Sequence, residues 1–163
     1  DIAQKTGHDP VAFLNELNQR IYHQCNYITR ETGAPQSAGQ TWQQKEGSCR
    51  DLAVLFMDIC RVMGLASRFV SGYQEGDPDM AEWDLHAWVE VYLPGAGWRG
   101  YDPSQGLIVC DRHIALVASA KPRYTTPIVG DYIPATVDVA VPIQSRLSSK
   151  ITLRKLAIPS GQQ

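Results

Sequence analysis

The chain has 163 residues, a net charge of −2, and 44% hydrophobic residues. This length suits one domain with an apolar core of its own, which folds without disulfides or a structural metal. The chain lacks the basic excess typical of nucleic-acid-binding proteins, so we expect no nucleic-acid partner. No apolar run reaches the ~20 residues of a membrane span, so we expect no membrane partner either.

The first predicted element is an amphipathic helix over residues 9–27, where apolar side chains recur with i, i+3, i+4 spacing. Asp9 fits the N-cap, and Pro10 fits the first turn, where a missing N–H costs nothing. Residues 31–44 contain Gly33, Pro35 and Gly39 and predict a loop.

A second helix is predicted from Cys49 to about Met63, because its apolar residues again have helical spacing. Ser48 fits the N-cap, and Asp51, three residues later, completes a capping box. Gly64 fits the position just after the helix. These signals place Cys49 in the first turn of a helix whose other residues are largely buried.

The following segments have the alternation of β-strands. Strands are predicted over residues 66–73, 85–93 and 98–102, with an acidic surface loop over 74–84 and a turn over 94–97. Later elements are predicted as a short strand or extended segment at 107–109, one or two helical turns at 112–118, an edge strand at 132–143, and a frayed tail at 160–163.

The chain has four cysteines, and no two have the CxxC spacing of a zinc knuckle. We expect reduced thiols and a cytoplasmic location. Most free cysteines are small buried hydrophobic residues, and we expect this of Cys25, Cys60 and Cys110.

Cys49 has a different setting, because a helix N-terminus favours a thiolate and offers free N–H groups to an oxyanion. A thiol enzyme also needs a base and a group that orients it, and His86 and Asp102 are the candidates. Each residue alone has an ordinary explanation: a buried cysteine, a structural histidine, a turn aspartate. Their order on a helix, a strand and the next strand makes the catalytic interpretation stronger.

The hairpin between His86 and Asp102 provides a geometric test. Cross-strand partners have a constant sum of residue numbers. If Leu93 paired with Trp98, Asp102 would lie opposite Val89, on the wrong face for His86. We therefore predict an odd-length turn or a bulge near residues 95–100, which brings Asp102 opposite Trp88 and diagonal to His86.

The segments GSCRDLAVLFMDICRVMGLASRFVSGY and DLHAWVEVYLPGAGWRGYDPS resemble the transglutaminase core of bacterial transglutaminase-like proteins. The resemblance covers residues 42–104, with fainter similarity over 9–132. It implies an α+β, papain-like fold in which a nucleophile helix packs on an antiparallel sheet. It also implies Cys49 as nucleophile, His86 as general base and acid, and Asp102 as the orienting group.

The same resemblance suggests further site residues. An upstream aromatic or amide side chain lines the oxyanion site in many relatives, and the candidates here are Tyr27, which we favour slightly, Gln43 and Gln44. Trp83 and Asp84 precede His86 and are candidates for substrate contact.

We expect a catalytic domain over residues 1–140 and an extension over 141–163. Many bacterial relatives carry a β-rich domain before the core, and its absence here fits a piece of a longer protein.

The expected reaction is cysteine-dependent acyl transfer or hydrolysis at an amide of a peptide or protein, through a thioester on Cys49. No cofactor is expected, and the acidic loop lacks the acid spacing of an EF-hand calcium site. A competing interpretation is another Cys-His-Asp enzyme, such as a peptide N-glycanase-like amidase or an arylamine N-acetyltransferase. Two more interpretations involve no cysteine catalysis: a non-catalytic peptide-binding module, and a metal site, for which one Cys, one His and one Asp form a poor set.

Overall fold

The computed structural model describes residues 1–30, 32–75 and 85–126. These residues belong to one compact unit, Asp1–Val129. Most of the predicted acidic loop, the edge strand at 132–143, and the extension at 141–163 lie outside the described residues. The predicted domain boundary at residue 140 therefore stays a prediction.

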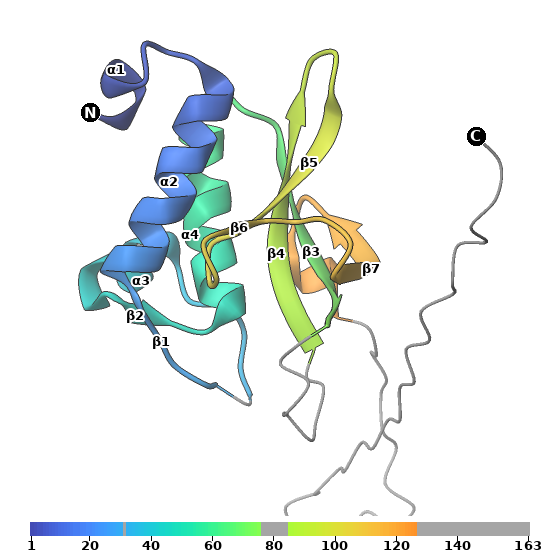
Figure 1. Ribbon diagram of the computed structural model, residues 1–163. Helices are drawn as coiled ribbons and strands as arrows, with labels where there is room; N and C mark the ends of the chain where they lie inside the picture. The colour runs from blue at the N-terminus through green and yellow to red at the C-terminus, as the bar shows by residue number, and fades with distance from the viewer. Residues whose placement is uncertain (31, 76–84, 127–163) are drawn as a thin grey trace, which may run out of the picture. The chain divides into compact units, whose positions relative to one another are not determined.

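Helices form one layer of this unit (Figure 1). The described helices are α1 (Ile2–Lys5), α2 (Pro10–Gln24), α3 (Ala38–Gln44), α4 (Cys49–Val62) and the 3-10 helix η1 (Pro122–Tyr124). The predicted cap of α2 is confirmed, since the Asp9 carboxylate accepts a hydrogen bond from the Ala12 N–H at 2.7 Å. No helix of the described part of the chain is long and apolar enough to cross a membrane.

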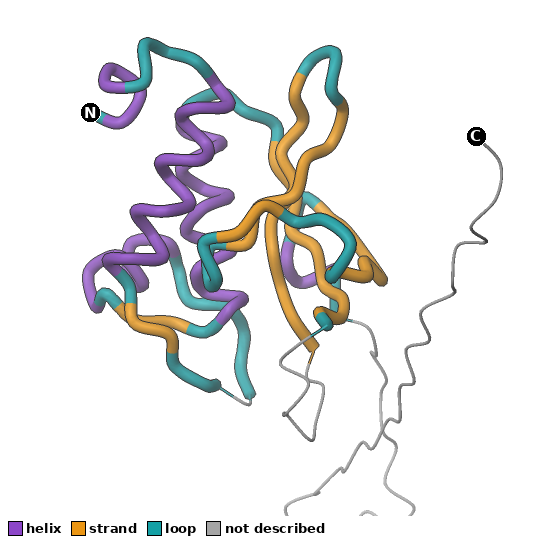
Figure 2. The backbone as a smooth tube through the Cα atoms, viewed as in Figure 1, coloured by secondary structure: helices purple, strands orange, loops and turns teal. Residues whose placement is uncertain are grey.

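An antiparallel sheet forms the other layer, and Figure 2 shows its strands beside the helices. It has five strands in the order β6-β5-β4-β3-β7. Their bounds are β3 (Ser67–Gln74), β4 (Leu85–Leu93), β5 (Gly97–Asp102), β6 (Leu107–Ile108) and β7 (His113–Ser119). A small parallel pair is formed by β1 (Asn26–Tyr27), which follows α2, and β2 (Glu46–Gly47), which directly precedes α4. This architecture confirms the predicted α+β, papain-like fold class.

The core lies between the two layers. Leu14, Leu17 and Ile21 of α2 are buried in one cluster with the apolar face of α4 and with Val89 and Val91 of β4. Helix α4 packs directly on β3 and β4, while α2 packs on α4. The aliphatic residues at every second position of β4 follow from this arrangement, because those side chains point toward the helices.

The predicted turn between β4 and β5 is confirmed. Leu93 pairs with Gly97, so the turn holds three residues, and Val89 pairs with Tyr101 in the same register. The next position of this register sets Asp102 opposite Trp88. The odd-length turn therefore brings His86 and Asp102 to one face of the sheet.

Two predicted elements were wrong. The segment over residues 31–44 was predicted as a loop, but its second part is helix α3. Ser37 is the N-cap of this helix, and its hydroxyl accepts a hydrogen bond from the Gln40 N–H at 3.3 Å. This cap offsets the unfavourable Gly39. The segment at 112–118 was predicted as helical turns, but it is strand β7, which pairs with β3. Pairing along β3 supplies the hydrogen bonds that a short helix would have had to make alone.

Candidate active site

Cys49 is the first residue of α4, and its side chain is partly exposed. The predicted capping box is present: Asp51 accepts a hydrogen bond from the Ser48 N–H at 2.8 Å. Of the N–H groups in the first helical turn, that of Asp51 bonds to the Ser48 carbonyl, while those of Cys49 and Arg50 have no carbonyl partner within the helix. The start of α4 therefore presents a thiol and free backbone donors at the same place.

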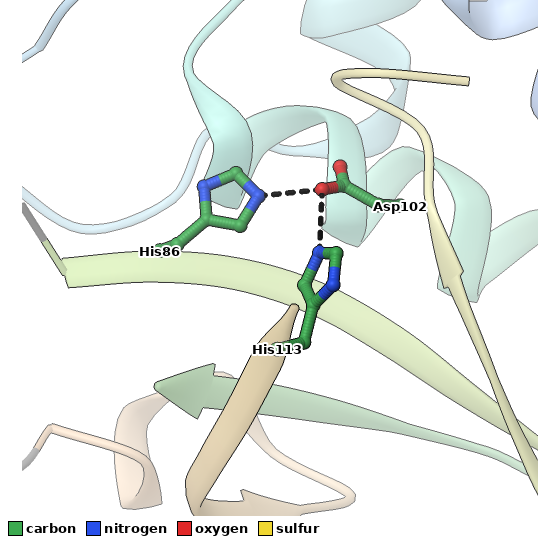
Figure 3. A group of neighbouring side chains, drawn as sticks. All are labelled: His86, Asp102 and His113. Carbon is green, nitrogen blue, oxygen red and sulfur yellow. Dashed lines mark hydrogen bonds and ion pairs between the residues drawn. The ribbon is translucent and has the colours of Figure 1, made fainter. Parts of the chain in front are cut away.

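His86 lies near the start of β4 and Asp102 at the end of β5. The His86 Nε2 atom is 2.6 Å from Oδ2 of Asp102, as Figure 3 shows. Asp102 is completely buried, and the His86 side chain is 12% exposed. The structure thus brings these two predicted residues into direct contact across the β4–β5 hairpin.

Cys49, the third predicted residue, also affects the His86 ring. The pKa of His86 is raised to about 9: burial alone would lower it, but hydrogen bonds with Asp102 and with the Cys49 thiol outweigh that effect. Cys49 and His86 also line the same cavity. The pKa of His86 therefore reflects both Asp102 and Cys49, while the catalytic roles of the three predicted residues stay predictions.

The Asp102 carboxylate accepts four hydrogen bonds. Oδ1 accepts from the backbone N–H of Ser104 at 3.0 Å and from its hydroxyl at 2.6 Å. Oδ2 accepts from His86 and, at 3.2 Å, from Nε2 of His113. Burial raises the pKa of Asp102, but these hydrogen bonds outweigh burial and hold that pKa well below its usual range. The carboxylate is thus a fixed negative charge beside His86.

His113 was not among the residues predicted for the site. It is the first residue of β7, and Figure 3 shows its ring and that of His86 approaching Asp102 from two different strands. The prediction of helical turns over residues 112–118 hid it. The short apolar run IALVA that follows it is the signal that could have placed it on a strand.

A second buried carboxylate anchors the start of α4. Asp51 is fully buried and accepts hydrogen bonds from Nη1 of Arg30 at 2.6 Å and from the Gln36 N–H at 2.8 Å, besides those from Ser48. Burial raises the pKa of Asp51, but the hydrogen bonds, led by that from Arg30, lower it overall. Arg50 adds hydrogen bonds to the carbonyls of Arg30 and Thr32. The loop before α3 is therefore fastened to the helix that carries Cys49.

This fastened loop forms one wall of a cavity of about 510 Å³ that both Cys49 and His86 line. The loop contributes Gly33, Ala34 and Pro35, and the sheet contributes apolar side chains such as Phe69. The cavity gives an acyl group access to the sulfur and the imidazole together.

The remaining predicted site residues are less well placed. Tyr27, Gln43 and Gln44 are exposed, and none of them lines the cavity. Tyr27 still lies close by, because it pairs with Gly47, two residues before Cys49. Trp83 and Asp84 lie outside the described residues. The roles suggested for all five stay predictions.

The remaining cysteines divide into two groups. Cys25 and Cys60 are buried, as expected, and burial raises the pKa of the Cys60 thiol to about 12. Cys110 was expected to be buried but is exposed, because it lies in the connection between β6 and β7 rather than on a core-facing element. All four cysteines are free thiols.

One group of side chains in the described part of the chain has ligand atoms close enough to hold a metal ion. His86, Asp102 and His113 have candidate ligand atoms within 4.8 Å of one another. The two hydrogen bonds to Oδ2 of Asp102 already account for these distances. Cys49 does not belong to this group.

Comparisons with known proteins show the family of this chain. The family model of the transglutaminase-like superfamily matches residues 1–103, which include Cys49, His86 and Asp102. An uncharacterised protein of Mycobacterium leprae is 30% identical over 131 residues, which are 77% of this chain and 46% of that protein. A protein-glutamine gamma-glutamyltransferase of Pseudomonas aeruginosa is 31% identical over 105 residues, which are 58% of this chain and 16% of that protein. The chain thus spans less than half the length of these relatives.

Solved structures show the same fold. A candidate cysteine protease from Cytophaga hutchinsonii superposes with a TM-score of 0.64 at 23% identity, covering 77% of this chain and 42% of that one. The periplasmic domain of TgpA from Pseudomonas aeruginosa gives a TM-score of 0.51 at 27% identity, covering 64% of this chain and 40% of that one.

Proposed function

Because the chain belongs to the transglutaminase-like superfamily, we propose that it catalyses acyl transfer from an amide through a thioester on Cys49. Cys49 is the nucleophile, His86 is the general base and acid, and Asp102 orients His86. The acyl donor is a peptide or protein amide.

The observation that carries this proposal is the position of the His86 ring between a buried carboxylate and a thiol. With a pKa of about 9, the ring is an imidazolium at neutral pH. An imidazolium that is hydrogen-bonded to Cys49 stabilises a thiolate there, which is the reactive form of cysteine. Ser104 holds the other oxygen of Asp102 with two hydrogen bonds.

The proposed reaction begins when the Cys49 thiolate attacks the amide carbonyl. The N–H groups at the start of α4 stabilise the negative oxygen of the tetrahedral intermediate. The His86 imidazolium then donates its proton to the leaving nitrogen, so the C–N bond breaks and an amine or ammonia departs. Water or a second amine attacks the thioester, His86 accepts its proton, and the thiolate is regenerated.

Two observations bear on the substrate. One relative is named a protein-glutamine gamma-glutamyltransferase, which supports a glutamine amide as the acyl donor. The described residues that line the cavity include no carboxylate that would attract an amine acceptor. We therefore propose that water resolves the thioester, which makes the net reaction hydrolysis.

The test uses carbobenzoxy-glutaminylglycine as the acyl donor. Ammonia release measures hydrolysis, and hydroxamate formation in the presence of hydroxylamine measures transfer to an amine. We expect release by the native protein, loss of at least ~10³-fold in Cys49→Ala and His86→Ala, and unchanged rates in the control Cys110→Ala. Circular dichroism confirms that each variant is folded.

Three outcomes would contradict the proposal. Turnover that survives Cys49→Ala would show that another nucleophile acts. Peptide binding without turnover would make the protein a binding module. Activity only toward a glycosylated asparagine or an acetyl thioester would identify N-glycanase-like or acetyltransferase chemistry instead.

A further inference from the structure

The His113 side chain is 3% exposed and contacts Asp102, but the reaction proposed above does not use it. We propose that His113 is a positioning residue, whose ring holds the Asp102 carboxylate in the orientation that fixes His86. This inference rests on the proposed function and adds a fourth residue to the site.

The first argument comes from the hydrogen bonds of Asp102. Without His113, Oδ2 has His86 as its sole partner among the described residues, while Oδ1 has two donors from Ser104. Such a carboxylate can rotate about its side-chain bond toward Ser104 and away from His86. The donor from His113 balances the two oxygens and keeps Oδ2 beside the catalytic imidazole.

The second argument concerns the tautomer of His113. Ionised Asp102 only accepts hydrogen bonds, so Nε2 of His113 carries the proton between them. Nδ1 of His113 is buried and has no hydrogen-bond partner among the described residues. A proton on Nδ1 would be a buried donor without an acceptor, which is costly. The N–H on Nε2 of His113 therefore points at Asp102.

The third argument is the space that the fold provides for this ring. Strands β7 and β5 are separated in the sheet by β3 and β4, so His113 reaches Asp102 across two strands. Gly72 of β3 gives the Trp88 ring and the β7 backbone the room that they occupy, since a Cβ there would lie 2.6 Å from the Trp88 ring and would also meet the backbone of β7. Trp88 packs edge-on against the His113 ring, with centroids 5.1 Å apart, and limits its movement.

The consequence is measurable at His86. The titratable groups that face His86 among the described residues are Cys49 from α4, Asp102 from β5, and His113 from β7. If Asp102 is held less firmly, it stabilises the His86 imidazolium less. The imidazolium then loses its proton at a lower pH, although the thiol and the cavity are intact.

The test follows alkylation of native protein by iodoacetamide over a range of pH, with the Cys49 peptide quantified by mass spectrometry. A thiolate–imidazolium pair gives reactivity at mildly acidic pH and a second change in rate where the imidazolium titrates. Exposed Cys110 provides an ordinary thiol as a reference in every sample.

Three substitutions separate the donor from the rest of the ring. His113→Leu keeps bulk without a donor, His113→Gln keeps an N–H near the position of Nε2, and His113→Asn places its N–H near Nδ1. We expect the upper step at about pH 9 in the native protein, about one pH unit lower in the Leu and Asn variants, and close to native in the Gln variant. The matched control His23→Leu, at an exposed histidine of α2, leaves the profile unchanged.

The result that would overturn the inference is a Leu variant whose upper step stays at the native pH or moves upward. Equal rescue by Gln and Asn would do the same, because a polar filler would then suffice. If the Leu variant does not fold, the comparison of Gln with Asn decides alone. A native Cys49 profile that matches Cys110 would instead reject the proposed function itself, and the inference with it.

Discussion

Replacing Asp51 by alanine tests how strongly the start of α4 depends on one buried carboxylate. The substitution removes the acceptor for Arg30, Gln36 and Ser48 together. It leaves the Arg30 guanidinium, 24% exposed, without its anion. Breaking a buried pair from one side costs about 3–5 kcal/mol of unfolding free energy. For a folded unit of this size, that corresponds to a fall in Tm of roughly 10–20 °C.

The assay is thermal and urea denaturation followed by circular dichroism, with Asp58→Ala as the matched control. Asp58 lies on the same helix and makes an exposed pair with Arg61 at 3.7 Å. Such a pair contributes at most about 0.5 kcal/mol. We also expect loss of activity in Asp51→Ala, because the cavity wall at residues 33–35 loses its anchor.

The pH dependence sharpens this prediction. The pKa of Asp51 is lowered in the folded state, so its stabilising effect is present above its ordinary value of 3.8 and is lost as the pH falls below that value. The difference between native protein and Asp51→Ala should therefore narrow in acid. If Asp51→Ala is no less stable than Asp58→Ala at neutral pH, the reasoning about this buried carboxylate is refuted.

Three further results are expected. Gly72→Ala lowers both Tm and activity, because the added Cβ meets the Trp88 ring and the β7 backbone. The control Gly39→Ala has open space around the added Cβ and lowers neither. Equal effects of the two substitutions would contradict this prediction. The rate constant kcat/KM falls above about pH 9, because the His86 imidazolium that protonates the leaving group loses its proton there; a rate that keeps rising would argue against this role. Cys60, whose pKa is raised to about 12 by burial, resists iodoacetamide until the protein unfolds, and rapid labelling of the native protein would show that the core opens.

Much of this site followed from local signals in the sequence. The capping box and apolar periodicity of α4 determine where Cys49 lies, because both act within one or two turns of helix. The register of the β4–β5 hairpin was predicted from the need to place Asp102 on the same face as His86. The observed three-residue turn produces this register. Short-range patterns were sufficient wherever the controlling contacts were close in sequence.

The missed features depend on distant partners. Helix α3 begins after the N-cap Ser37, and the glycines of this segment led to its prediction as a loop. Strand β7 is stabilised by pairing with β3, whose residues lie 39 to 50 positions earlier in the chain. His113 is placed beside Asp102 by that pairing, and Gly72 leaves room for the Trp88 ring that packs on the His113 ring. Periodicity within a short window cannot report such contacts.

The most direct test of the proposed chemistry is to capture the acyl group on the enzyme. Native protein is mixed with carbobenzoxy-glutaminylglycine, quenched in acid after a few turnovers, and digested for mass spectrometry. We predict one acyl group, with loss of ammonia, on the peptide that contains Cys49, and none in Cys49→Ala. Continued turnover with that peptide unmodified, or an acyl group on a different residue, would contradict a thioester mechanism at Cys49.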